Sequence, residues 1–313
     1  MAKGASGVGI AATLAAAVLW GSSFSVNDVG LDHVGPGTFV ALRFALAAAV
    51  TLGFLALLGR ADTHLLRQKW FWGLCLANAL AFLLQYSAQT MTTPARTALF
   101  VNVSAFSVAL FERALFGMRL GVPRWVAILL GFGGAAVLIA SGDPEGLRGG
   151  ETLGDALALA AGLVWSLYFV YNDRAVERED PVHLVAWTFG GTALLLAWAP
   201  FADPWLSPAG TTGMDGAGAL AILYSGLVTT ALAFGLWAYG LTRIRASISA
   251  VILLVEILVA SLVSLALGRE SFGAVDLAGA ALLCAAIVVA SLVAQRDADL
   301  ALRAAPRARP RGR

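Results

Sequence analysis

Charged residues are scarce in this sequence, and their scarcity excludes a water-soluble protein. Only 13% of the 313 residues are Asp, Glu, Lys or Arg, whereas 59% are hydrophobic and the mean hydropathy is +0.81. A soluble domain keeps roughly a quarter of its residues charged to cover its surface. We therefore expect an integral membrane protein.

Histidines, cysteines and nucleotide-binding motifs are scarce as well. The three histidines, His33, His64 and His183, lie in expected loops or at segment ends, which leaves none for a metal site or a proton relay in mid-membrane. Cys75 and Cys284 fall inside apolar segments and predict no disulfide. The short loops contain no P-loop, so ATP-driven transport is excluded. We expect no cofactor, no bound metal and no nucleic-acid partner.

Long apolar runs dominate the rest of the chain. Ten of them are about 20 residues long, which is enough to cross a bilayer as a helix. They are continuous and rich in Leu and Ala, whereas the strands of a membrane barrel would alternate. In chain order, segments one to ten lie at 8–26, 36–58, 71–90, 95–117, 122–141, 152–171, 181–200, 216–240, 244–267 and 273–294. The expected fold class is an all-α integral membrane protein with ten transmembrane helices.

The chain also repeats itself. Residues 11–36 align without gaps on residues 156–181, a constant shift of 145 residues. Five apolar segments separate the two copies, so the second copy enters the bilayer from the opposite side, as in the inverted repeats of secondary transporters. We expect five-helix repeats at 1–145 and 146–295. The informative matches are Trp20/Trp165, Phe24/Phe169, Asn27/Asn172, Asp28/Asp173 and Pro36/Pro181.

Basic residues predict the orientation, because Lys and Arg near span ends stay on the cytoplasmic side. With the N-terminus inside, 17 of the 21 basic residues lie on the inner side, and only Arg148 and Arg269 lie in outer loops. We expect both termini in the cytoplasm and the protein in the inner or plasma membrane. The tail at 296–313 is rich in Arg, Ala and Pro, which predicts a disordered cytoplasmic segment that is attracted to anionic lipid.

Several short motifs resemble the EamA-type repeat of the drug/metabolite transporter superfamily. They are the stretches Trp20–Phe24, Ala41–Phe44, Leu253–Glu256 and Leu267–Glu270. The likeness covers nearly all of residues 8–294. It implies two inverted five-helix bundles in which segments one, three, four, six, eight and nine line a central cavity, whereas segments five and ten lie away from it. It also implies a structural role for Arg43.

The sequence departs from that family pattern at three positions. Ala105 and Ile257 stand where the family often has Pro, and Met118 stands where it commonly has Glu. Without these prolines the sequence does not predict a helix break of the family type in segments four and nine.

Glu256 is the most informative polar residue, because it lies about halfway along segment nine. An ionised carboxylate there costs roughly 2.5 to 3.5 kcal/mol on insertion scales, so it should face protein or water. Arg245 and Ser249 share its helix face. In a cavity, Glu256 would contact a cationic or hydrogen-bonding substrate or carry a proton. The alternative is a structural carboxylate that is hydrogen-bonded to neighbouring helices.

Other polar and aromatic side chains recur at helical spacing. Such stripes indicate a cavity lining, although interhelical hydrogen bonds and interfacial Trp anchors are the alternatives. Arg96 mirrors Arg245 and either binds a substrate carboxylate or snorkels to the interface. We expect Asn78, Gln85, Trp165, Tyr168 and Glu256 to converge on one cavity. The full set of predicted substrate-binding residues is Trp20, Ser23, Asn27, Asn78, Gln85, Gln89, Arg96, Trp165, Tyr168, Asn172, Trp237, Ser249 and Glu256.

These features predict a secondary active transporter and no enzymatic activity. Alternating access within one chain would export small organic metabolites such as amino acids or their derivatives, and proton coupling would depend on Glu256. The expected partners are the small-molecule substrate and membrane lipid, and a homodimer is left open. The alternatives are a polytopic membrane enzyme, a channel, or a multidrug efflux carrier for cationic or aromatic compounds. The segments contain no Ser/His or paired-Asp arrangement, which argues against the enzyme.

Overall fold

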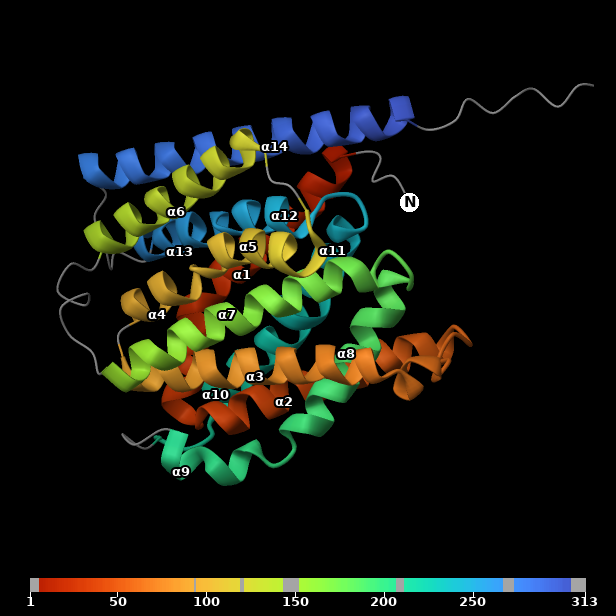
Figure 1. Cartoon of the computed structure of the whole chain (residues 1–313). Helices are drawn as coiled ribbons and strands as arrows, with labels where there is room; N and C mark the ends of the chain where they lie inside the picture. Colours follow the sequence, from red (N-terminus) through yellow and green to blue (C-terminus); the bar gives the residue numbers. More distant parts are fainter. Residues whose placement is uncertain are drawn as a thin grey trace, which may run out of the picture.

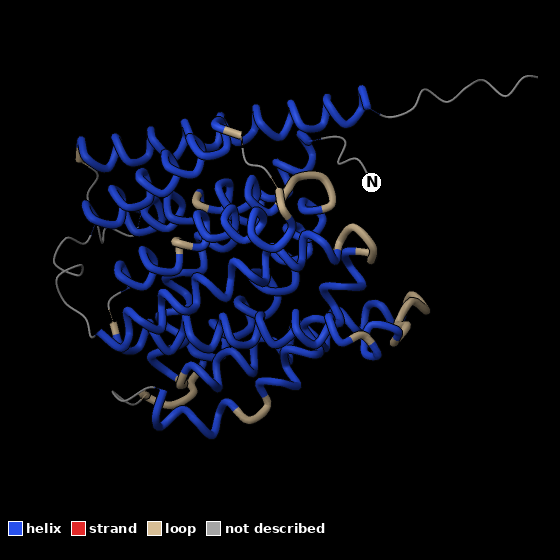
Figure 2. Tube along the Cα trace, viewed as in Figure 1, coloured by secondary structure: helices blue, strands red, loops and turns tan. Residues whose placement is uncertain are grey.

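The protein is an all-helical integral membrane protein in the part of the chain that the structure describes. The computed structural model describes residues 6–92, 94–118, 121–142, 152–206, 211–266 and 273–304, and every regular element in them is helical (Figure 2). Seven helices are long and apolar enough to cross a membrane, or up to nine if each of two bent pairs is one span. The helical class is thus confirmed, and the count of ten spans stays a prediction.

Each of the ten apolar segments coincides with one or more helices. In chain order these are α1 Ser6–His33, α2 Pro36–Leu57, η1 His64–Arg67, α3 Lys69–Met91, α4 Pro94–Val101, α5 Ser104–Phe116, α6 Val122–Gly142, α7 Thr152–Ala175, α8 Pro181–Leu196, η2 Ala199–Ala202, α9 Asp203–Leu206, α10 Gly216–Tyr224, η3 Ser225–Leu232, α11 Ala233–Leu241, α12 Ala246–Leu253, α13 Val255–Ala266 and α14 Ala274–Ala304. Helix α14 continues beyond the expected end of segment ten and covers the beginning of the tail that was expected to be disordered. Residues 305–313 of that tail lie outside the described residues.

The two halves of the chain are interleaved rather than stacked as separate bundles. Helices α6 and α14 lie side by side along one edge, and α2 packs on α8 at the opposite edge (Figure 1). Between these edges α3 packs on α7, while α10, η3 and α11 pack on α1. In the same way α4 and α5 contact α7, and α12 and α13 contact α1. Each of the long helices of one half therefore has its main neighbours in the other half.

Two helices are interrupted at corresponding places without proline. Segment four breaks between α4 and α5, where the backbone N–H of Ala105 donates to Asn102 O at 3.1 Å. Segment nine breaks between α12 and α13, where the N–H of Ile257 donates to Leu254 O at 3.2 Å. Both bonds span three residues instead of four, so a tightened turn interrupts each helix. The sequence did not predict these breaks, because neither segment has the expected proline. A tightened turn can interrupt a helix without one, since all its N–H groups are present.

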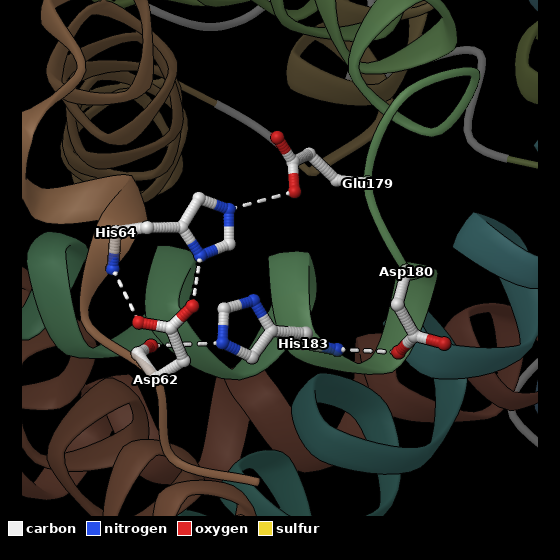
Figure 3. A network of polar contacts seen from close by, with 5 residues as sticks. All are labelled: Asp62, His64, Glu179, Asp180 and His183. Atoms are coloured by element: carbon white, nitrogen blue, oxygen red, sulfur yellow. Dashed lines mark hydrogen bonds and ion pairs between the residues drawn. The ribbon is translucent and has the colours of Figure 1, made fainter.

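A cluster of titratable side chains joins two loops at one end of the molecule (Figure 3). His64 Nδ1 lies 2.8 Å from Asp62 Oδ2, and His64 Nε2 lies 2.9 Å from Glu179 Oε2. The ring of His183 stacks on His64 at 5.1 Å, and its Nε2 lies 2.9 Å from the carbonyl oxygen of Asp62. Arg60 forms an ion pair with Asp180 beside them. The cluster connects the loop between α2 and α3 to the loop between α7 and α8.

We expect this cluster to make stability depend on pH. Hydrogen bonds to Glu179 and then Asp62 raise the pKa of His64. The contribution of protonated His64 is therefore complete below its unfolded-state pKa of about 6.5 and is lost as the pH rises through the raised pKa. His64→Asn should lower the Tm of the detergent-solubilised protein more at about pH 6 than at about pH 8.5.

Glu177 provides the control for this measurement. It lies near Glu179 and pairs with Arg174 at 3.6 Å, outside the histidine cluster. Glu177→Gln should leave the shape of the Tm profile unchanged. An equal loss of Tm at both pH values in His64→Asn would show that the side chain contributes only packing.

Candidate functional site

A cavity lies between helices of the two halves. Its volume is about 90 Å³, which is room for several water molecules. Its walls come from α1, α3, α4, α5, α7, α11, α12 and α13, together with one residue of α2. These helices belong to segments one, three, four, six, eight and nine, and segments five and ten contribute no residue to the lining. Arg43 of α2, in segment two, also lines the cavity, although the family resemblance implied only a structural role for it.

Corresponding positions of the two halves face each other across this cavity. Besides the shift of 145 residues, the chain contains a second register in which Ala79–Phe82 and Ala231–Phe234 have the same sequence, Ala-Leu-Ala-Phe, at a shift of 152 residues. The shift of 145 residues does not reveal that register, which relates two of the three phenylalanines of the lining, Phe82 and Phe234. The related pairs that line the cavity are Trp20/Trp165, Phe82/Phe234, Val101/Leu253 and Ser104/Glu256.

Aromatic rings form the apolar part of the wall. The ring centroids of Trp20 and Phe234 are 4.9 Å apart, and those of Phe82 and Trp165 are 4.8 Å apart. Trp20 Nε1 donates to the carbonyl oxygen of Thr229 at 2.7 Å, and Trp165 Nε1 donates to Gln85 Oε1 at 2.8 Å. Because both indole N–H groups already have acceptors, these two rings offer apolar surface to a ligand.

Arg43 supplies a positive charge to the cavity. Its side chain is 1% exposed, and its guanidinium lies 4.7 Å from the centre of the Phe82 ring. Nε donates to Thr230 Oγ1 at 2.9 Å, Nη2 donates to Thr229 Oγ1 at 3.2 Å, and Nη1 donates to the hydroxyl of Tyr86. These partners are neutral hydroxyl groups, so they hold the guanidinium in place without neutralising it.

The two threonines that hold Arg43 belong to a stretch of π-helix. Residues Ser225–Leu232 (η3) have this wider turn between α10 and α11. The hydroxyls of Thr229 and Thr230 both donate to the carbonyl oxygen of Ser225, at 3.1 and 2.7 Å. Their oxygens can then accept from two nitrogens of one guanidinium. Widened turns of this kind are frequent at functional sites.

Glu256 supplies a titratable carboxyl group at the first turn of α13. The side chain lines the cavity and is partly exposed. No group whose position the structure describes donates a hydrogen bond to its carboxylate, so the described residues give no support to the structural alternative. The backbone of Glu256 is held against α1, because a Cβ added at Gly21 would lie 2.5 Å from the carbonyl oxygen of Glu256.

Three further predicted residues lie on this wall in existing hydrogen bonds. Ser23 Oγ donates to the carbonyl oxygen of Trp20 at 2.7 Å, and Asn27 Nδ2 donates to Ser23 Oγ at 3.3 Å. Ser225 Oγ donates to Asn27 Oδ1 at 2.9 Å, while Gln85 accepts from Trp165. These amides and hydroxyls therefore stiffen the wall as well as lining it.

Of the five residues expected to converge, Gln85, Trp165 and Glu256 line this cavity, whereas Asn78 and Tyr168 do not. Asn78 shares a helix face with Gln85, but seven residues place it about 10 Å further along α3. There its Nδ2 donates to Thr192 Oγ1 of α8 at 3.1 Å. Tyr168 lies outside the lining and stacks on Trp237 at 5.8 Å. A shared helix face did not predict the neighbouring helix at each depth.

Four more of the predicted residues, Trp237, Ser249, Asn172 and Gln89, also lie outside the lining. Trp237 Nε1 donates to Ser249 Oγ at 2.9 Å, so these two join α11 to α12. The side-chain atoms of Asn172 and Gln89 Oε1 are buried. The side chain of Arg96 lies outside the described residues.

One family model and several named transporters match this chain. The sequence model of the EamA-like transporter family matches residues 7–140 and 152–292. A probable amino-acid metabolite efflux pump of Salmonella typhimurium is 29% identical over 288 residues, which cover 87% of this chain and 91% of the relative. A protein of the same name from Escherichia coli K12 is 29% identical over 234 residues, which cover 70% of this chain and 73% of the relative.

A further relative and a solved structure cover about nine-tenths of the chain. An uncharacterized transporter of Archaeoglobus fulgidus is 28% identical over 284 residues, which cover 90% of this chain and 96% of the relative. A crystal structure of a protein with 23% identity has a TM-score of 0.75 and covers 92% of this chain and 99% of its own. The crystal structure supports the fold alone.

Proposed function

Since this chain belongs to the EamA-like transporter family, we propose that it is a secondary active exporter of small organic metabolites such as amino acids or their derivatives. One observation carries the proposal: the cavity lies between corresponding positions of the two halves, where secondary transporters place their substrate site. The substrate class rests on the two relatives named as amino-acid metabolite efflux pumps.

The proposal includes ten spans arranged as two inverted repeats. Contacts between loops support this arrangement, because they sort the loops into two sets. His64–Glu179 joins the loops after segments two and six. In contrast, Thr92 Oγ1 donates to Asp155 Oδ1 at 2.9 Å, which joins the end of segment three to the start of segment six. His33 and Asp215 join the loops after segments one and seven. Ten alternating spans place the first contact on one side and the other two contacts on the opposite side.

The proposed orientation has both termini in the cytoplasm of a cell with this protein in its inner or plasma membrane. The excess of Lys and Arg on the side of His64 supports it. Single cysteines introduced at Gln68 and Thr211 should react with a membrane-impermeant reagent from opposite sides of intact cells, and only Thr211→Cys should react from outside. Identical labelling at both positions would contradict the ten-span arrangement.

Alternating access with proton coupling completes the proposed mechanism. Glu256 can exchange a proton with whichever side the cavity faces, and its lack of a described hydrogen-bond donor leaves the carboxylate available for this exchange. Rocking of the interleaved halves would expose the cavity to each side in turn. The proton and the substrate would occupy the cavity alternately, and alternate occupation is what the exchange of a proton for a substrate molecule requires.

A flux measurement on purified protein in liposomes tests the proposal. Vesicles loaded with a mixture of unlabelled amino acids should accumulate a labelled amino acid transiently by counterflow, with saturable kinetics. A channel would give non-saturating flux without counterflow, and an enzyme would give no flux of an unchanged substrate. Absence of counterflow for every amino acid, together with counterflow of an organic cation, would favour the multidrug alternative.

A further inference from the structure

We infer that the cavity recognises a zwitterion with an apolar side chain. Arg43 binds the carboxylate of the substrate, Glu256 binds its ammonium group, and the aromatic wall contacts its apolar part. The inference rests on the proposed transport function and specifies its substrate class. It distinguishes free amino acids from the other compounds that an exporter of organic metabolites could carry.

Two N–H donors of the Arg43 guanidinium are not used by the described partners. It has five N–H groups, of which one on Nε, one on Nη1 and one on Nη2 donate to Thr230, Tyr86 and Thr229. The other two, one on each terminal nitrogen, have no acceptor among the groups that the structure describes. Among the groups that the structure describes, each one that accepts from this buried guanidinium is a neutral hydroxyl. A carboxylate is the ligand that satisfies two N–H groups and the charge together.

Glu256 offers the complementary charge in the same cavity. Both side chains line it, yet Arg43 and Glu256 form no ion pair with each other. A ligand with one charge would leave the opposite charge of the site without a partner. A ligand that carries an ammonium and a carboxylate satisfies both, so the pair of charges selects for a zwitterion.

The rest of the wall selects the side chain of the ligand. Trp20, Trp165, Phe82 and Phe234 present ring surface, and the two indole N–H groups are already bonded within the protein. Asn27 is likewise engaged with Ser23 and Ser225. These rings therefore offer contact to an apolar or aromatic side chain.

Three matched compounds test the inference. Phenylalanine carries both charges, phenethylamine lacks the carboxylate, and 3-phenylpropionate lacks the ammonium group. Each should compete with labelled phenylalanine for counterflow, and removal of either charge should weaken competition about tenfold to a hundredfold, since each loses a hydrogen bond to a charged group. Equal competition by the three compounds, or no competition by any of them, overturns the inference.

Substitutions at the two charges give the second arm. Glu256→Gln should weaken competition by phenylalanine and phenethylamine and leave 3-phenylpropionate unchanged. Arg43→Gln should weaken competition by phenylalanine and 3-phenylpropionate and leave phenethylamine unchanged. The control is Glu112→Gln, because Glu112 is a buried carboxylate of α5 outside the cavity. Uniform weakening of all three compounds by Glu256→Gln contradicts its role at the ammonium. If Arg43→Gln does not fold, the compound series with Glu256→Gln decides.

Ligand-induced stabilisation separates recognition from transport. Phenylalanine should raise the Tm of the detergent-solubilised protein more than either singly charged compound at equal concentration. A Tm shift without counterflow leaves the zwitterion site in place and refutes the proposed transport. Counterflow of amino acids without preference for both charges leaves the transport in place and refutes the zwitterion site.

Discussion

Glu256→Gln should abolish the proton-driven accumulation of substrate while exchange continues at saturating substrate. The substitution keeps the size of the side chain and its capacity for hydrogen bonds, but it removes the group that titrates. Proteoliposomes with an imposed pH gradient should concentrate labelled amino acid with the unchanged protein and fail to do so with the variant. Exchange without a gradient requires substrate binding alone, so it should persist with a raised KM.

Glu112 is again the matched control. It is 2% exposed, and its Oε1 accepts a hydrogen bond from the backbone N–H of Ser247 at 3.2 Å at the first turn of α12. Gln at this position keeps that acceptor, so Glu112→Gln should retain accumulation. If Glu256→Gln still concentrates substrate with normal pH dependence, Glu256 is structural. If instead Glu112→Gln loses accumulation, Glu112 of α5 is the residue that couples transport to protons.

Gly21→Val should abolish transport. A Cβ at this position would lie 2.5 Å from the carbonyl oxygen of Glu256 and 2.7 Å from the Cβ of Val259, so α1 and α13 would have to move apart. Backbone cannot yield as a flexible side chain can, and such overpacking costs about 1 to 3 kcal/mol or more. The displaced backbone carries Glu256, so the geometry of the cavity changes as well. Counterflow should fall at least about tenfold, with Gly21→Ala intermediate.

Gly53 provides the comparison for the same chemical change. It is exposed on α2, and a Cβ there would meet no atom within 4 Å. Gly53→Val should therefore retain at least about half of the counterflow. Both variants should be checked for expression and for a single peak in size-exclusion chromatography. Normal counterflow in Gly21→Val would show that the close approach of α1 to α13 is dispensable.

Segment positions and the aromatic pair could be predicted from the sequence because both depend on local information. An apolar run of sufficient length forms a helix in a membrane whatever it packs against. The repeat also placed Trp20 and Trp165 at corresponding positions, and both line the cavity. Glu256 was identified because an ionisable residue halfway along a span needs protein or water around it.

The surroundings of other residues depend on helices that are distant in sequence. Asn78 and Gln85 share a face of α3, yet one meets Thr192 of α8 and the other meets Trp165 of α7. Arg43 carries no local sign that it lines a cavity, because its partners Thr229 and Thr230 lie in the other half of the chain. The breaks after α4 and α12 escaped prediction because a tightened turn has no residue signature comparable to proline.

The interleaving of the two halves has a consequence for biosynthesis. Arg43 precedes Thr230 by 187 residues, and ribosomes add about 5 to 20 residues per second. For roughly 10 to 40 seconds the guanidinium of Arg43 is therefore separated from the two threonine hydroxyls that later hold it. Lipid headgroups, water or the insertion machinery must solvate the charge during that interval. The nascent first half is consequently the stage at which this protein is most exposed to quality control.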